Sequence, residues 1–167
     1  MLSDQFIQIF RDEHRKIRDT LLALIRAFEE RDKNRIKSLL IQAATFTRPH
    51  FRYEEEALYP ALTGIFVEEY IEKLLGDHDR AIGIDIKLVE IAEKEPLTGD
   101  DAAKAVQLIR RVLPHVSNCD GLSITTETFP DEEIKMVLDR RESANQAGLD
   151  LLTWADQVRT RPLVIAE

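Results

Sequence analysis

The chain contains four histidines whose spacing would bring all four side chains to one level of a helical bundle. They are His14, His50, His78 and His115. The midpoints between consecutive histidines fall at Asp32, at Gly64 and at Pro96–Leu97, in stretches where Gly, Pro, Asp and Asn interrupt a helical pattern. Residues equidistant from a turn lie side by side in an antiparallel bundle. Four imidazoles that meet in this way, with carboxylates beside them, have the chemistry of a transition-metal site.

Carboxylates lie close to every histidine in the sequence. Glu54 follows His50 by four residues, which places both side chains on one face of a helix, where the carboxylate can contact one metal ion or bridge two. The acids near the other histidines are Glu13, Asp77, Asp79 and Asp120. We expect some of these to accept the imidazole N–H that faces away from a metal, and others to be ordinary surface charge.

The ligand types favour two iron ions over one zinc ion. Structural zinc has about four closed ligands, commonly includes cysteine, and seldom draws one ligand from each of four long helices. Imidazole and carboxylate in the core of a bundle are the ligands of di-iron and di-manganese proteins.

Apolar residues recur at intervals of three and four along almost the whole chain, and each histidine completes such a repeat on its own segment. The sequence therefore predicts an all-α fold, an up-down-up-down four-helix bundle with an additional C-terminal helix. The expected helices cover residues 3–30, 33–61, 66–95 and 99–120, with a fifth near 131–157. We assign residues 1–130 to the bundle and residues 131–167 to a C-terminal helix packed on the same domain.

Local signals set the expected helix ends. Ser3, Asp32 and Thr98 can cap the first, second and fourth helices. Pro60 marks the end of the second helix, because proline lacks the backbone N–H that a helix requires. The fourth helix is expected to distort or stop near Gly121.

The fifth segment is amphipathic and contains no histidine, so we interpret it as a structural lid or a dimerisation helix. Its side chains expected to face inward are Leu138, Leu149, Leu152 and Trp154.

Composition narrows the class of protein. The length of 167 residues fits one domain, and the net charge of -8 argues against a nucleic-acid or anionic-membrane partner. The single cysteine, Cys119, excludes an internal disulfide and fits a reducing compartment. The N-terminus lacks the pattern of a secretory signal, and no apolar run approaches the ~20 residues that span a bilayer. We expect a soluble, cytoplasmic protein.

Three phrases carry a resemblance to a known family: EHRKI around His14, HFRYEEEALYP from His50, and HDRAI from His78. With His115 and a following acid, they resemble the hemerythrin-like, HHE cation-binding family. The resemblance implies a four-helix bundle with two non-haem iron ions that are oxo- or hydroxo-bridged. It also implies that the four histidines are terminal iron ligands and that Glu54 is a bridging carboxylate.

The chain departs from classical oxygen-carrying hemerythrins in its third helix. Those proteins have a second histidine four residues after the first, where this chain has Ile82, and the position four residues before His78 is Leu74. One iron should therefore have an open or water-filled position, or a carboxylate in place of imidazole. Open positions favour reaction with O₂, peroxide or NO over simple oxygen storage.

A second departure concerns the fourth helix. Many family members have glutamate four residues after the histidine, where this chain has Cys119; Asp120, at five residues, matches the spacing of the classical hemerythrins. We expect Asp120 to be the metal ligand of this helix, with Glu127 as the alternative. Cys119 is a thiolate ligand, a redox-active thiol or a small core residue. Tyr53 either hydrogen-bonds a bound oxygen species or serves in packing.

These residues lead to three hypotheses about function. The first is a non-haem di-iron protein that binds or senses O₂, NO, redox state or iron, working with a separate protein partner if it is a sensor. The alternative is an enzyme that reduces peroxide or NO, or a ferroxidase. The third is a metal-free interaction module with buried histidines.

Overall fold

The computed structural model describes residues 1–163, and these residues contain helices and turns but no strand. The elements are α1 (Leu2–Glu30), α2 (Lys33–Tyr53), the π-helical turn η1 (Glu54–Leu58), α3 (Tyr59–Leu62), α4 (Glu68–Ala92), α5 (Gly99–Asp120), the 3₁₀ segment η2 (Gly121–Thr128), α6 (Asp131–Gln146) and α7 (Leu151–Gln157).

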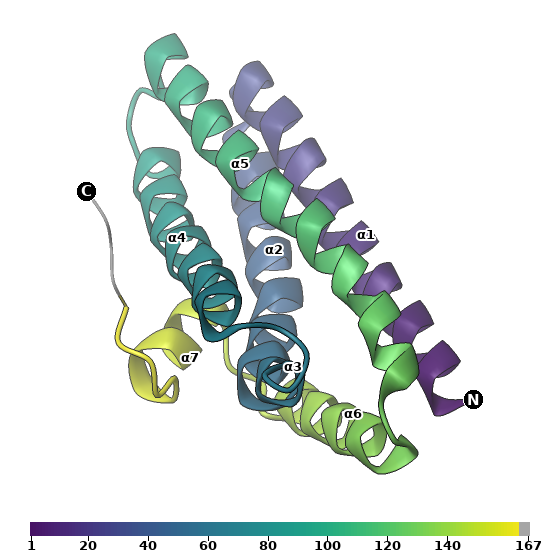
Figure 1. Ribbon diagram of the computed structural model, residues 1–167. Coiled ribbons are helices and arrows are strands. Elements are labelled where there is room, and N and C mark those ends of the chain that lie inside the picture. The colour runs from purple at the N-terminus through teal and green to yellow at the C-terminus, as the bar shows by residue number, and fades with distance from the viewer. Residues whose placement is uncertain (164–167) are drawn as a thin grey trace.

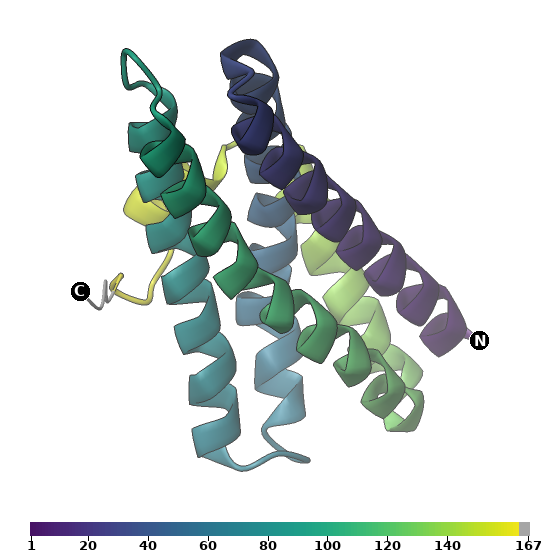
Figure 2. The ribbon, with the colours of Figure 1, turned by 90° about the horizontal axis from the view of Figure 1, so that it is seen from above.

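Four long helices form the body of the molecule. Helices α1, α2, α4 and α5 run side by side and alternate in direction (Figures 1 and 2). Around the bundle, α1 packs against α2 and α5, and α4 packs against the same two helices. The structure confirms the predicted all-α bundle with additional C-terminal helical structure.

The capping residues of two helices are as predicted, because caps depend on local sequence. The Asp32 side chain accepts a hydrogen bond from the backbone N–H of Arg35, and Thr98 forms a capping box with Asp101. The fourth helix ends at Asp120 and becomes a 3₁₀ segment at Gly121, also as predicted. The prediction for Ser3 was wrong, because the helix begins one residue earlier and Ser3 is buried within its first turn.

The second helical segment, predicted over residues 33–61, ends at Leu62, and a π-helical turn interrupts it before Pro60. Pro60 has no N–H for an α-helical bond, and the residues before it form the wider π-helical turn, in which the N–H of Tyr59 bonds to the carbonyl of Glu54. The wider turn brings Tyr59 back toward the side of the helix that carries Glu54. On a regular α-helix, a five-residue step would rotate Tyr59 by about 140° from that side.

The C-terminal segment is two helices where one was predicted. The break lies at Gly148, which has φ 68°, in the left-handed region that glycine adopts readily, and Asp150 then caps α7. Helix α6 packs against α2, α1 and η1, and α7 packs against α2 and α4. Residues 164–167 of the proposed segment 131–167 lie outside the described part of the chain.

The inward-facing side chains of this segment differ in part from the prediction. Trp154 is fully buried, as predicted, and so is Leu151, which was not predicted. The remaining predicted residues are only half-buried; they are Leu138, Leu149 and Leu152.

The core has two large apolar clusters with a polar layer between them, and a third, smaller cluster includes Leu151 and Trp154 of α7. An aliphatic cluster that includes Leu24, Leu88 and Ile109 fills one half of the bundle. A second cluster, which contains Phe10 and Tyr59, fills the other half. All four histidines lie in the layer between the two clusters, where their helices pass from one to the other.

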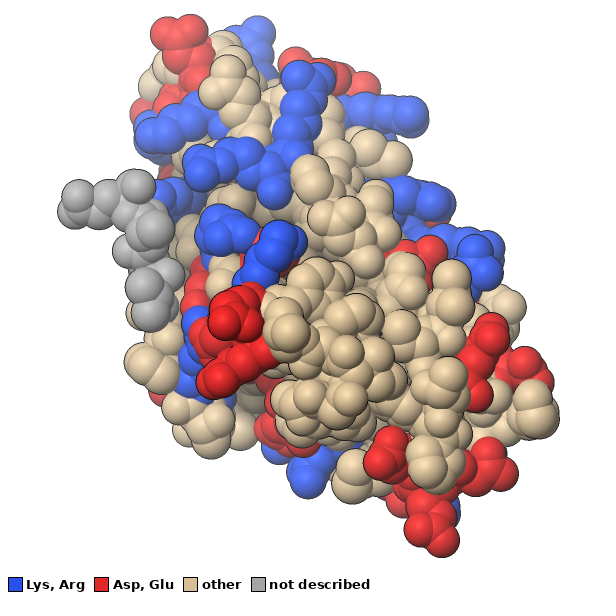
Figure 3. All heavy atoms as spheres, in the orientation of Figure 1, with Lys and Arg blue, Asp and Glu red and all other residues tan. Residues whose placement is uncertain are grey.

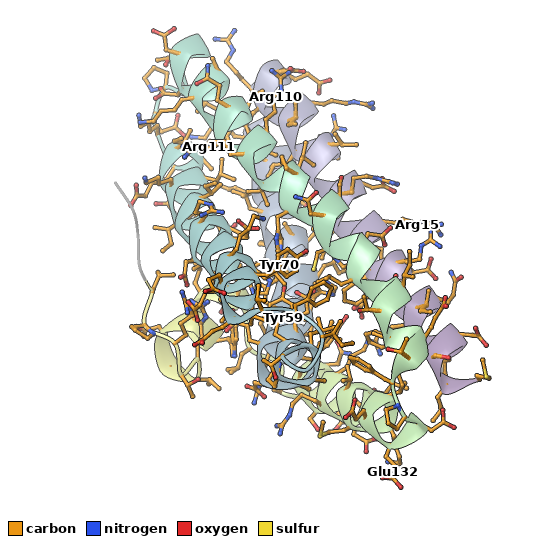
Figure 4. All side chains as sticks on the ribbon, in the orientation of Figure 1. Arg15, Tyr59, Tyr70, Arg110, Arg111 and Glu132 are labelled. Atoms are coloured by element: carbon orange, nitrogen blue, oxygen red, sulfur yellow. The ribbon has the colours of Figure 1, made fainter. Side chains whose placement is uncertain are left out.

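The surface carries charge of both signs. On the face shown in Figure 3, Lys and Arg side chains gather over the upper half of the bundle, where Figure 4 labels Arg110 and Arg111. Acidic side chains occupy the lower right of that face, near Glu132 at the start of α6. Within residues 1–163, no helix has a stretch long and apolar enough to cross a membrane.

Candidate metal centre

The four histidines converge, as their spacing predicts. Their exposed fractions are between 0% and 8%. The ring centroids of His14 and His50 are 4.5 Å apart, and those of His78 and His115 are 5.1 Å apart. One imidazole therefore comes from each of four separate helices into one buried layer.

The Nδ1 atom of every ring faces an oxygen atom outside the centre of the cluster. The pairs are His14 with the Phe10 carbonyl at 2.8 Å, His50 with Glu13 at 2.9 Å, His78 with Glu55 at 2.8 Å, and His115 with Asp77 at 3.2 Å. An oxygen at this position requires Nδ1 to be the protonated nitrogen. Each neutral ring therefore presents the lone pair of Nε2 to its neighbours, as a metal ligand does.

Glu54 lies at the centre of the four Nε2 atoms. Its carboxylate is fully buried, with Oε1 3.4 Å from His50 Nε2 and Oε2 3.1 Å from His78 Nε2. Oε2 accepts no hydrogen bond in the structure. A buried carboxylate oxygen without a partner is costly, and a cation bound there would remove that cost.

Two groups of possible ligand atoms share this carboxylate. One consists of His14, Glu54 and Cys119, and the other of Glu54, His78 and His115; within each group the atoms lie within 4.8 Å of one another. The Nε2 atoms of His14 and His50 are 3.3 Å apart, which adds His50 to the first group. Both groups of donor atoms therefore include Glu54, and each group could hold a cation.

Cys119, not Asp120, faces the cluster from α5. The Cys119 thiol is fully buried and donates to Glu54 Oε1 at 2.9 Å. The carboxylate of Asp120 lies outside the cluster, 37% exposed and 3.8 Å from Arg11. The helix stays α-helical up to Asp120, so a residue five positions after His115 points away from it. Our expectation for Asp120 required a distortion that begins only at Gly121, and the alternative, Glu127, is exposed.

Tyr59, not Tyr53, is the phenol that faces the cluster. The Tyr53 hydroxyl donates to Glu13 at 2.7 Å and lies 3.0 Å from Nδ1 of His50, on the side of that ring away from the centre. The Tyr59 hydroxyl lies 3.1 Å from Nε2 of His78 and 3.6 Å from the sulfur of Cys119. Tyr59 was not predicted from the sequence, because its orientation depends on the π-helical turn.

Burial and charge act in opposite directions on two of the rings. Burial alone would lower the pKa of His50, but the carboxylates of Glu54 and Glu13 outweigh burial and raise it to about 10. His78 has the same balance with Glu54 and Glu55, and its pKa is also raised. His50 and His78 are therefore the two rings whose pKa the surrounding carboxylates raise.

The other two rings stay neutral. Burial, followed by the positive charge of His50, lowers the pKa of His14 to about 4. Burial, followed by the positive charge of His78, lowers the pKa of His115 to about 3. Neutral imidazole is the form that binds a metal ion. These two rings therefore do not have to release a proton near neutral pH before they can bind one.

The acids next to the histidines in sequence act across helices. Glu13 contacts His50 and not its neighbour His14, and Asp77 contacts His115. Asp79 contacts no histidine and instead accepts from Arg159 and Arg161.

The carboxylates that hold His50 and His78 also accept from arginines of the C-terminal segment. Arg141 of α6 contacts Glu13, and Arg159, directly after α7, contacts Glu55. Neither arginine nor Glu55 was singled out from the sequence, where each stands within an ordinary charged run.

A small apolar cavity of about 50 Å³ adjoins the cluster. His14, His50 and His115 lie at one end of it, and aliphatic side chains such as Leu21 and Ile109 form most of its wall. Its volume exceeds that needed for one water molecule and suits a ligand of a few atoms.

A family model for the hemerythrin HHE cation binding domain matches residues 5–121. The match confirms the resemblance noted in the sequence and covers all of the cluster residues, whereas α6 and α7 lie beyond it. No curated protein and no solved structure matches the chain.

Proposed function

The chain belongs to the hemerythrin HHE cation-binding domain family, and on that premise we propose that its buried cluster binds two non-haem iron ions and that the protein binds or senses O₂, NO or redox state there. The observation that supports the proposal is the convergence of four buried imidazoles on the carboxylate of Glu54, whose Oε2 has no hydrogen-bond partner. Imidazole and carboxylate together suit iron.

The donor atoms divide between two ions. His14, His50, Cys119 and Oε1 of Glu54 would hold the first. His78, His115 and Oε2 of Glu54 would hold the second. The acceptor at each Nδ1 keeps the rings turned so that Nε2 faces inward, which orients the ligands before an ion arrives.

Bound iron would supply electrons and open coordination positions for a small ligand. The chain itself limits what can reach those positions. Ile82 and Leu74, the aliphatic side chains next to His78 on its helix face, are fully buried and leave the second ion with fewer imidazoles. The apolar cavity admits a diatomic molecule and has no room for a large substrate.

An enzyme that reduces peroxide or NO, or a ferroxidase, is the second candidate. The Tyr59 hydroxyl favours it, because this O–H points into the cluster and can donate a proton or a hydrogen bond there. Steady turnover of peroxide or NO by the iron-loaded protein would favour the enzyme. A stoichiometric and reversible spectral change would favour binding or sensing.

The proposal is tested by metal analysis and by anaerobic titration of the metal-free protein with Fe(II). We expect two iron ions per chain, and an absorption change when NO is added to the ferrous protein. One zinc ion per chain in both the purified and the titrated protein would overturn the proposal.

Zinc is the main rival because Cys119 brings a thiol into the donor set. The variant Cys119→Ser distinguishes iron binding from zinc binding. If iron binds as proposed, the serine variant still takes up two ions through the remaining imidazoles and Glu54. If the site is built for zinc through its thiolate, the variant loses most of its zinc affinity.

A further inference from the structure

Two partly buried carboxylates lie between the cluster and the C-terminal segment, and each joins a histidine to an arginine. The first is Glu13. Its Oε2 accepts from Nδ1 of His50 at 2.9 Å and from the Tyr53 hydroxyl at 2.7 Å, while its Oε1 accepts from Nε of Arg141 at 2.6 Å. Both oxygens of this carboxylate are therefore used, one toward the cluster and one toward α6.

The second carboxylate is Glu55, which has the same connection on the other side of Glu54. It accepts from Nδ1 of His78 at 2.8 Å, and Arg159 grips both of its oxygens, with Nε at 2.9 Å and Nη2 at 2.8 Å. The third arm of the guanidinium, Nη1, donates to Asp79 at 2.7 Å. The Arg159 side chain is only 1% exposed, so water does not weaken these contacts as it does at a surface pair.

The two arginines reach the cluster independently. Arg141 lies within α6 and Arg159 follows α7, and both are beyond the residues that match the family. His14 and His115 have no such support, since His14 is held by a backbone carbonyl and His115 by Asp77, whose cationic partners Lys73 and Arg80 are more than half exposed.

We propose that Arg141 and Arg159 are positioning residues for the metal centre. They hold the carboxylates of Glu13 and Glu55, which in turn fix the rings of His50 and His78 and set how strongly these rings donate to iron. This inference rests on the proposed function, because it assumes that the cluster binds metal. It assigns to the C-terminal segment a role in the chemistry of the centre in addition to packing.

The physical reason for this role is the free-energy cost of removing a carboxylate from water. A carboxylate removed from water needs a counter-charge and hydrogen bonds, and a guanidinium supplies both in a fixed geometry. A carboxylate held in this way orients the imidazole by its N–H and increases its basicity as a ligand. Without the arginine, the carboxylate would turn toward water or toward another cation, and the ring would lose its anchor.

The test compares four glutamine variants of the full-length protein. Arg141→Gln and Arg159→Gln remove the proposed contacts. Arg140→Gln and Arg161→Gln are matched controls, because Arg140 contacts only Glu56, at 3.4 Å, and Arg161 contacts Asp79 and Glu72. The measurements are Fe(II) affinity by competition with a chelator, the midpoint reduction potential of the loaded protein, and the melting temperature of the metal-free protein.

We expect Arg141→Gln and Arg159→Gln to weaken Fe(II) binding roughly 10- to 100-fold, the usual effect of removing a group that holds a metal ligand. The midpoint potential should shift downward in both, because the loss of a nearby positive charge favours the more positive, oxidised metal. Arg140→Gln should bind Fe(II) with the affinity and potential of the wild type, and Arg161→Gln, which leaves Asp79 to Arg159 alone, should stay much closer to the wild type than Arg159→Gln.

Lysine variants separate positioning from general stability. Arg141 donates one hydrogen bond to Glu13, so Arg141→Lys should recover most of the affinity and potential. Arg159 grips Glu55 with two nitrogens, which lysine cannot reproduce, so Arg159→Lys should recover much less.

The outcomes keep the two proposals apart. If Arg141→Gln and Arg159→Gln each bind two Fe(II) ions with the affinity and the midpoint potential of the wild type, the inference is overturned and the proposed function stands. It is also overturned if affinity only follows the melting temperature across all variants and lysine restores nothing. If the wild type itself binds no iron, the proposed function fails first.

Discussion

The two sides of the cluster are supported differently. On the side of α2 and α4, His50 and His78 each donate to a carboxylate that an arginine of the C-terminal segment holds. On the side of α1 and α5, His14 and His115 rely on groups of the four-helix bundle alone. In Figure 2, α1 and α5 cross the front of the molecule, and α6 and α7 lie behind them. We call the side with His50 and His78 the braced side, and the side with His14 and His115 the open side.

The difference shows how residues beyond a shared domain can alter the surroundings of histidines inside that domain. The family match ends at residue 121, so the bundle and its ligands belong to the family, whereas both braces come from the sequence that follows. The two sides also differ in electrostatics: carboxylates of the bundle raise the pKa of His50 and His78, whereas burial lowers the pKa of His14 and His115. The C-terminal arginines contact two of those carboxylates, Glu13 and Glu55.

The largest effect is expected from Glu54→Gln, because Glu54 is the one residue that both sides share. At a thousandfold excess of Fe(II) over its dissociation constant, binding should raise the unfolding free energy of the wild type by about 4 kcal/mol. The variant should lose most of this gain, since an amide cannot bridge two cations as a carboxylate does. Anaerobic thermal unfolding of both proteins, with and without Fe(II), measures this gain in stability.

Glu56→Gln is the control for this experiment, because Glu56 is exposed and contacts only Arg52 and Arg140. Equal stabilisation of Glu54→Gln and wild type by iron would show that the carboxylate is not a ligand.

The next largest effect is expected from the carboxylates that accept the histidine N–H groups, which differ between the two sides. Glu13→Gln should weaken Fe(II) binding by at least ~10-fold, because the amide is uncharged and its one oxygen cannot accept from both His50 and Arg141, as the carboxylate does. Asp77→Asn should weaken it less, because the contact with His115 is longer, at 3.2 Å, and the carboxylate also serves exposed cations. Chelator competition measures both, and the reverse order would contradict the distinction between the sides.

The bundle and the convergence of the histidines could be predicted because they depend on local and periodic signals. Apolar spacing, the caps at Asp32 and Thr98, and equal distances from turns determine where each ring lies along its helix. The position of Asp120 could not be judged in this way. It depends on whether the helix distorts before or after that residue, and Cys119 faces the cluster instead.

The braces could not be predicted, because they join residues that are far apart in sequence. Arg141 and Glu13 are separated by 128 residues, and Arg159 and Glu55 by 104. No local pattern marks either pair. The partner of Glu13 illustrates the same limit: adjacent residues on a helix point in different directions, so Glu13 reaches His50 on another helix and not His14.

A smaller effect is expected where the C-terminal segment destabilises the bundle. Burial, followed by the negative charge of Asp150 at the start of α7, raises the pKa of Asp85 on α4 to about 6. The folded protein therefore holds this proton more tightly than the unfolded chain, and the unfolding free energy falls as pH rises from about 4 to about 6 and stays lower above. Asp85→Asn should stabilise the protein by about 1 to 2 kcal/mol at pH 7.

Urea unfolding of Asp85→Asn at pH 7 and pH 4 tests this sign, because the gain should disappear at the lower pH, where the carboxyl is protonated in both states. Glu90→Gln, at an exposed position of the same helix, is the control and should change little. A gain of equal size at both pH values would mean that charge is not its cause.

The smallest effect concerns the turn that directs α7 onto the braced side. Gly148 has φ 68°, and a Cβ there would meet nothing closer than 4.0 Å, so Gly148→Ala should cost about 1 kcal/mol through backbone strain alone. Gly148→Asn should cost less, because asparagine tolerates this conformation. Gly64→Ala, in a turn without a positive φ, is the control. Hydrogen exchange should show faster opening of α7 in Gly148→Ala, and unchanged exchange there would separate this turn from the brace that Arg159 provides.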